Sequence, residues 1–284
     1  MIRILLRQRK KQWNKHDYKA PWKERIVPWL FLAPSLFVVS VMVLLPLLDA
    51  FRRSFFLAVS SRFVGLQNYI SVLGNSAFKL AAGNTAKFIA VCMPLLLVIS
   101  LSIALMLTAF QEKHGIFKTS FLVPMAIPVA SIVLLWRVIF HRNGLLNGIL
   151  ALWDAAPVDW IGSAASFGVL VFAYLWKNFG YDMVLWLSGI SAINPALYEA
   201  AQIDGARPWQ SFYYVTVPHI KMVVGLLVVL RTVWIFNNFD LIYLITGGGP
   251  AGTTQTIPLY AYNMGWSTKL IGRSSAVTVL LFIL

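Results

Sequence analysis

Long apolar stretches separated by short polar segments are the most regular feature of the sequence. A helix needs about 20 apolar residues to cross the hydrocarbon layer of a membrane. Stretches of that length lie at 27–50, 86–110, 119–140, 166–190 and 222–246. A sixth stretch begins near Ser274 and reaches the last residue, Leu284, so it covers only part of a span. The pattern therefore predicts an all-α, polytopic membrane helix bundle with six transmembrane helices, the last of them truncated.

The composition agrees with this prediction. Of the 284 residues, 59% are hydrophobic and only 12% are charged, and the mean hydropathy is +0.73. These values are typical of a membrane protein and exclude an ordinary soluble domain. The single cysteine, Cys92, lies inside an apolar stretch, so it forms no intramolecular disulfide and gives no information on the redox compartment.

Basic residues are concentrated at the N-terminus, although the whole chain has a net charge of +14. A basic segment beside a first span is typical of a cytoplasmic tail next to anionic lipid, which favours membrane contact over nucleic-acid binding. We therefore predict a basic cytoplasmic tail at 1–25, a membrane domain at 26–284 and no nucleic-acid partner. The basic residues of the tail are Arg3, Arg7, Arg9, Lys10, Lys11, Lys15, Lys19, Lys23 and Arg25.

A polar segment at 194–218 interrupts the apolar pattern and predicts a helix, a corner and a second helix. Asn194 is a suitable N-cap, and Pro195 follows at the first helical position, where its missing N–H is harmless. The residues up to Asp204 favour a helix, and Gly205 supplies the left-handed conformation that ends one. We expect Gly205 to have a positive φ.

Beyond the corner, Pro208 begins a second short helix over Trp209 to Val217, which we expect Pro218 to interrupt. The whole segment closely resembles the EAA loop of ABC importer permeases of the carbohydrate-uptake group. The residues that match are Glu199, Ala200, Ala201, Asp204, Gly205, Ala206, Phe212 and Pro218.

The resemblance implies that this loop is a coupling helix, which docks into a cleft on a cytosolic ATPase. It implies that Glu199 pairs with a basic residue of the ATPase and that Asp204 holds the corner. The coupling residues implied by the match are Glu199, Ala200, Ala201, Asp204 and Gly205.

A second polar block contains Asn237-Asn238-Phe239-Asp240 and, further on, Thr246-Gly-Gly-Gly-Pro250. The glycines are not a phosphate-binding loop, because no Gly-Lys-Ser/Thr follows them; they predict a sharp turn after the fifth span. The block resembles the signature of one of the two permease types in sugar importers, which implies a heterodimer with a second, related permease. The chain has no Walker A pattern, so ATP and Mg are expected in a separate ATPase, and no cofactor is expected in this chain.

No pattern in the sequence predicts an enzyme. The four histidines are scattered, with no i, i+4 pair and no carboxylate at a spacing suited to a metal. No nucleophile lies beside a candidate base. We therefore predict no catalytic residue and no metal site; the histidines are His16, His114, His141 and His219.

Several polar residues lie within the predicted spans, where an ionisable group is unfavourable unless it faces protein or water. Snorkelling accounts for Arg137 and Asp182 near span ends, and hydrogen bonds between helices account for Asn178. Arg231 lies deeper in the fifth span. It either binds a substrate oxygen or pairs with a carboxylate of the partner permease, and a cavity-facing Arg231 would favour an acidic saccharide.

A sugar presents hydroxyls and an apolar ring face, so its site needs amide or carboxylate groups beside an aromatic ring. Trp234 and Asn238 are four residues apart and would share a helix face. A glycine at the matching position of span four in the family lets substrate or a neighbouring helix approach. Helix packing alone is the alternative for each residue. The predicted substrate-binding residues are Gly180, Arg231, Trp234, Asn237, Asn238 and Asp240.

Together these matches imply a permease subunit of an ATP-driven, binding-protein-dependent importer for a sugar or oligosaccharide. The implied partners are a second homologous permease, two cytosolic ABC ATPases, an extracellular solute-binding protein and the lipid of a prokaryotic cell membrane, with the N-terminus cytoplasmic. Two alternatives stay open: an importer for another polar solute (a polyol, a glycerol phosphate ester or an acidic saccharide), and a secondary transporter, which typically shows inverted repeats.

Overall fold

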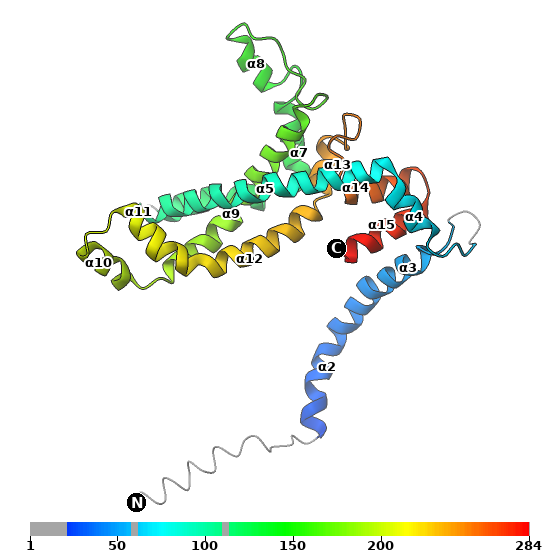
Figure 1. Ribbon diagram of the computed structural model, residues 1–284, viewed down its shortest axis with the longest axis horizontal. Helices are drawn as coiled ribbons and strands as arrows, with labels where there is room; N and C mark the ends of the chain where they lie inside the picture. Colours follow the sequence, from blue (N-terminus) through cyan, green and yellow to red (C-terminus); the bar gives the residue numbers. More distant parts are fainter. Residues whose placement is uncertain (1–21, 58–61, 110–113, 284) are drawn as a thin grey trace, which may run out of the picture. The chain divides into compact units, whose positions relative to one another are not determined.

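The computed structural model describes residues 22–57, 62–109 and 114–283. The chain divides into two units, Met1–Arg53 and Ser54–Leu284. Apart from one isolated bridge between Phe56 and Phe63, all regular structure in the described residues is helical (Figure 1). The predicted all-α class is confirmed.

The first unit contains one long helical segment. Helix α2 (Trp22–Val39) continues through a short π-helical segment, η2 (Ser40–Leu44), into α3 (Leu45–Arg53). Ile26–Arg53 is long and apolar enough to cross a membrane, which confirms the first predicted span. Widened π-helical turns and internal prolines are the usual causes of bends in a helix, and this segment has both, with prolines at 28 and 34.

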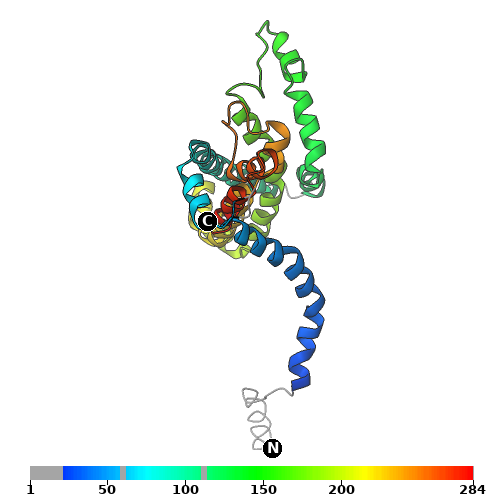
Figure 2. The same cartoon turned by 90° about the vertical axis from the view of Figure 1, so that its right-hand side faces the viewer.

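Three long helices form the frame of the second unit. Helices α5 (Ser76–Ala109), α9 (Ser166–Ser191) and α12 (Val217–Phe236) lie side by side in Figure 1, and Figure 2 looks along them. Their facing sides form apolar clusters in which Leu96 and Leu227 are fully buried. The second predicted span therefore begins at Ser76 and not at residue 86, whereas α9 matches the predicted span at 166–190.

The predicted span at 119–140 is wrong as a single helix. The chain instead forms α6 (His114–Ala126) and α7 (Val129–Ile139), which bend by 93° at the break between them. Pro128 has no N–H and disfavours helical geometry in the residue before it, so the helix stops there. The carbonyl of Ile127 accepts a hydrogen bond of 2.8 Å from Lys177 Nζ on α9. This bond satisfies a backbone group that the break leaves free.

The fifth span also ends earlier than predicted, at Phe236 and not at residue 246. The chain turns through residues 237–239 and then forms α13 (Asp240–Ile245). Gly247 and Gly248 follow with φ of +61° and +89°, which confirms the predicted glycine turn.

Shorter helices complete the second unit. They are α4 (Gln67–Gly74), α8 (Leu145–Ala151), α14 (Ile257–Tyr262), η4 (Asn263–Ser267) and α15 (Ile271–Ile283). Helices α4, α14 and α15 pack together near the start of α5 (Figure 1). By length and composition, three described helices can cross a membrane, or four with the bent α6–α7 pair. The count of six spans stays a prediction.

A buried ion pair joins α9 to α12. Arg231 Nη2 lies 2.6 Å from Asp182 Oδ1, and both residues are fully buried. Arg231 also donates to the side-chain and backbone oxygens of Asn178, at 3.1 and 3.0 Å. Its guanidinium lies over the ring of Trp234, 4.8 Å from the centroid. Asp182 therefore does not snorkel, and the carboxylate that pairs with Arg231 comes from this chain and not from a partner permease.

Gly180 allows α6 and α9 to approach each other closely. A Cβ atom at this position would overlap the backbone carbonyl oxygen of Phe121 on α6. Of the two explanations for this glycine, substrate access or a neighbouring helix, the structure shows the neighbouring helix.

We predict that Gly180→Ala pushes α6 away from α9 and lowers the free energy of unfolding by about 2 kcal/mol, as overpacking of an interior does. The matched control is Gly168→Ala on the same helix, where a Cβ would meet nothing within 4 Å. It should change stability by less than about 1 kcal/mol. Thermal unfolding of the purified protein in detergent measures both effects, and equal losses would contradict the packing role of Gly180.

We also predict that Asp182→Asn destabilises the protein by about 3–5 kcal/mol, because it leaves the charge of Arg231 buried and unpaired. The control is Asp49→Asn, which breaks the Asp49–Arg53 pair, whose side chains are 46% and 54% exposed. An exposed pair contributes about 1 kcal/mol or less. Chemical denaturation compares the two variants. A loss in Asp182→Asn as small as that in the control would show that the buried pair is not important for stability.

Candidate functional site

A polar cavity of about 260 Å³ lies where α12 ends and α13 begins. The last turn of α12 contributes Trp234 to its wall, and the turn that follows contributes Asn237 and Asn238. Helix α9 forms the facing wall, and Val129 at the start of α7 closes one side. The polar and aromatic residues that line the cavity are Tyr174, Lys177, Asn178, Trp234, Asn237, Asn238, Phe239 and Asp240.

The early end of α12 creates this cavity. Asn237 is the C-cap of α12, and its side chain donates to the carbonyl of Val233 at 2.9 Å. Asp240 is the first residue of α13, where a negative charge is favourable at a helix N-terminus. The prediction that Trp234 and Asn238 share one face of a continuous helix is wrong, because α12 ends between them. They line the same cavity because the chain turns between them.

Among the residues that line the cavity, Asn238 has a buried side-chain nitrogen that makes no hydrogen bond with a described residue. A buried polar group without a partner costs about 1–3 kcal/mol, so native structures rarely leave one unsatisfied. Because this nitrogen is not exposed, a hydroxyl group of a ligand reaches it only after a small rearrangement of the turn.

The structure therefore brings together Trp234, Asn237, Asn238 and Asp240 of the predicted residues. Gly180 and Arg231 do not line the cavity. Arg231 acts on its wall indirectly, through the hydrogen bonds to Asn178 and the contact with the Trp234 ring.

Sequence reasoning placed Gly180 of α9 in this site but not the three residues of α9 that line the cavity. Tyr174, Lys177 and Asn178 are spaced i, i+3 and i+4, so they share one face of α9. Three polar groups on one face of an otherwise apolar span are a signal that could have identified this wall.

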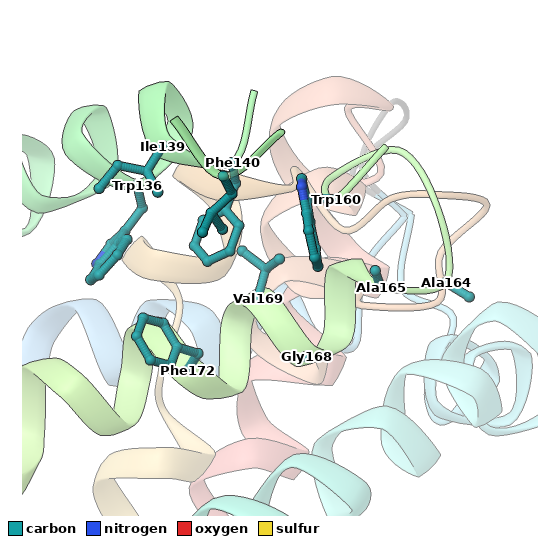
Figure 3. Close-up of a pocket in the computed structure, with 10 residues that line it drawn as sticks. Trp136, Ile139, Phe140, Trp160, Ala164, Ala165, Gly168, Val169 and Phe172 are labelled. Atoms are coloured by element: carbon teal, nitrogen blue, oxygen red, sulfur yellow. The ribbon is translucent and has the colours of Figure 1, made fainter. Parts of the chain in front are cut away.

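A larger cavity, of about 570 Å³, lies between α7, the 140–165 connection and the start of α9. Figure 3 shows the rings of Trp136, Phe140, Trp160 and Phe172 around it. The indole N–H of Trp160 is already bonded to Asn147 Oδ1, at 3.1 Å. This lining is almost wholly apolar, so the smaller cavity suits a polyhydroxylated ligand better.

The loop at 194–218 lies at the opposite end of α12. Helix α10 (Pro195–Ile203) begins as predicted, with Asn194 Oδ1 accepting from the backbone N–H of Ala196 at 3.0 Å. Gly205 has a φ of +74°, which confirms the predicted left-handed corner. The N–H of Ala206 then bonds to the carbonyl of Ala201 at 2.9 Å and closes the corner.

The second part of the loop differs from the prediction. Helix α11 (Pro208–Ser211) continues through the π-helical segment η3 (Phe212–Thr216) into α12, and Pro218 lies in the first turn of α12 without interrupting it. The widened turn accommodates the proline, which has no N–H to donate. As a result, Pro208–Phe236 forms one helical segment from the corner to the cavity. The 20 residues of α12 alone span about 30 Å.

Within the described ranges, no group of three or more His, Cys, Asp or Glu side chains could hold a metal ion. The prediction of no metal site concerns the whole chain, and parts of it lie outside these ranges.

Comparison with known proteins adds the family. Residues 97–284 match the family described as binding-protein-dependent transport system inner membrane component. The trehalose/maltose transport system permease protein of Thermococcus litoralis is 35% identical, over 95% of this chain and 94% of the relative. The lactose transport system permease protein of Rhizobium radiobacter is 30% identical, over 83% and 82%.

A solved structure shows the same fold. A chain in the crystal structure of a bacterial ABC transporter that imports the acidic polysaccharide alginate has a TM-score of 0.82 at 23% identity, over 92% of this chain and 94% of that one. The family match covers both the cavity and the loop at 194–218. The chain belongs to the binding-protein-dependent transport system inner membrane components, the permease subunits of ABC importers, which are not themselves enzymes.

Proposed function

We propose that this chain forms part of the translocation path of a sugar or oligosaccharide importer, with the polar cavity as its contribution to the substrate site. One observation carries the proposal: the amide side chains of Asn178, Asn237 and Asn238 line the same cavity as the half-exposed ring of Trp234. Amide and hydroxyl groups beside an aromatic face are what a sugar requires. The relatives named for trehalose/maltose and for lactose support a sugar as substrate.

Two neighbouring side chains fix the position of the Trp234 ring, which suits it to stack against a sugar. Tyr181 lies 5.1 Å from it between centroids, and the guanidinium of Arg231 lies 4.8 Å from its centroid. Because Arg231 is fixed by Asp182, the ring is positioned before a ligand arrives.

The loop at 194–218 is proposed to dock on a cytosolic ATPase that binds ATP and Mg. Helix α10 has no buried residue, and Ile203 is 86% exposed next to the corner. Glu199 is exposed and forms no ion pair with a described residue. Leu197 and Trp209 of the same loop are also exposed, at 41% and 60%, and several exposed apolar residues near a carboxylate are typical of an interaction surface.

In this mechanism two ATPases close on ATP and move the loops of this permease and of a second, related one. The continuous helical segment Pro208–Phe236 transmits the movement, because it joins the corner to the cavity without a break. A solute-binding protein delivers the sugar from outside, and residues 1–25 and 194–218 lie in the cytoplasm. ATP and substrate then both shift the equilibrium between the same two conformations of the helix bundle, which is the requirement for coupling between distant sites.

We predict that Trp234→Ala and Asn238→Ala each lower uptake of labelled sugar by about tenfold, the equivalent of about 1.4 kcal/mol of lost binding. Uptake is measured in proteoliposomes that contain equal amounts of assembled complex. Trp153→Ala is the control, because Trp153 is 72% exposed and lies outside the cavity. Unchanged uptake and unchanged sugar selectivity in both cavity variants would rule out this site.

We predict that Glu199→Arg and Gly205→Leu abolish ATPase association while the permease still inserts into the membrane. Any side chain at Gly205 is strained at its positive φ, by about 1 kcal/mol for alanine and more for leucine. The control is Gly225→Ala, because a Cβ there meets nothing within 4 Å and the φ is not positive. Co-purification of the ATPase and substrate-stimulated hydrolysis are the measurements. Wild-type values in both loop variants would refute the coupling role.

A further inference from the structure

Two side chains of opposite charge line the polar cavity: Lys177 from α9 and Asp240 from α13. Lys177 Nζ donates one hydrogen bond, to the carbonyl of Ile127 at 2.8 Å, and retains two further N–H donors. The carboxylate of Asp240 makes no hydrogen bond with a described residue, and neither side chain forms an ion pair with one. Both charged groups are therefore available to a ligand.

The third charge near the cavity, on Arg231, is already compensated. Its guanidinium pairs with Asp182 in a site where both residues are fully buried, and its other donors bond to Asn178. The Arg231–Asp182 pair therefore adds no net positive charge that would attract an anionic substrate. The remaining lining residues are uncharged: Val129, Tyr174, Asn178, Trp234, Asn237, Asn238, Phe239 and Leu241. The described wall carries one positive and one negative charge, which sum to zero.

Building on the function proposed above, we propose that this cavity selects an uncharged polyhydroxylated solute, with Lys177 as donor and Asp240 as acceptor for its hydroxyl groups. A hydroxyl both donates and accepts, so one sugar can use both groups at once. A carboxylate, sulfonate or phosphate on the solute would be attracted by Lys177 but repelled by Asp240 within the same small cavity. Such a group would also lose its hydration on entry.

Asp240 has a second role, because its charge also stabilises the N-terminus of α13. The test must distinguish this structural role from the proposed role in the charge balance of the cavity. The structural role is independent of Lys177. A direct measurement of the electrostatic potential in the cavity distinguishes the two, since a structural role alone does not predict that the two charges cancel.

The measurement uses the assembled complex with Asn237→Cys as a reporter thiol on the cavity wall. The native Cys92 is fully buried and does not compete. Rates of reaction with a cationic and an anionic methanethiosulfonate are compared, and their ratio is divided by the ratio for a small free thiol. We expect a normalised ratio within fivefold of one. Lys177→Gln should favour the cationic reagent, and Asp240→Asn the anionic one, by roughly tenfold each, because each variant removes one unit charge from the wall of the same cavity.

Two variants serve as controls. Lys177→Arg keeps the positive charge and should keep the ratio. Lys269→Gln removes a positive charge that lies over Trp266, outside the cavity, and should also keep it. Because Lys177 also bonds to Ile127, Lys177→Met replaces Lys177→Gln if the latter does not assemble.

A normalised ratio more than fivefold from one in the parent would overturn the proposal, because the cavity would then favour a charged solute. A shift smaller than fivefold in either charge variant would also overturn it, because the two charges would not balance at this wall. The thiol reactions need no transport. Failure of the substrate site itself would instead appear as normal sugar uptake by the Trp234 and Asn238 variants.

Discussion

The pair between Asp182 and Arg231 is the interaction on which the second unit most depends. Two charges inside an apolar bundle are tolerated only when each satisfies the other, and here they fix α9 against α12. The same arginine holds Asn178 and the ring of Trp234, which both line the polar cavity. The ion pair therefore sets the register of the helices and the shape of the cavity wall together.

Helix α12 connects the two places where partners are proposed to act. It continues without a break from α11 and η3, which follow the glycine corner, and its last turn carries Trp234 to the cavity. The proline at 218 does not weaken this connection, because a π-helical segment precedes it. At the cavity end the chain leaves the helix, so that Asn238 lines the cavity from a turn and Asp240 from the first residue of α13. A continuous helix that joins two such sites is a suitable element for transmitting a movement.

Local chemistry made part of this structure predictable. Apolar length predicted the helical class, and the residue types of Asn194 and Gly205 predicted the start and end of α10. The rest depends on contacts between distant segments. The break before Pro128 is stabilised by Lys177, and the partner of Arg231 is 49 positions away in sequence. For the cavity, the residues of span five were predicted and Gly180 was predicted on span four, but the residues of α9 that line the cavity were not, because a sequence does not show which face of a helix lines a cavity.

The central claim is that this chain is part of an ATP-driven, binding-protein-dependent importer, and the most direct test of it is to identify the energy source for uptake. The complete complex is reconstituted in proteoliposomes with this chain, a second permease, the ATPases and the binding protein, and accumulation of a labelled sugar that the binding protein binds is followed over time. We expect accumulation against a gradient only with ATP inside the cytoplasmic compartment and binding protein on the other side. Accumulation driven by an ion gradient without ATP, or without the binding protein, would contradict the claim.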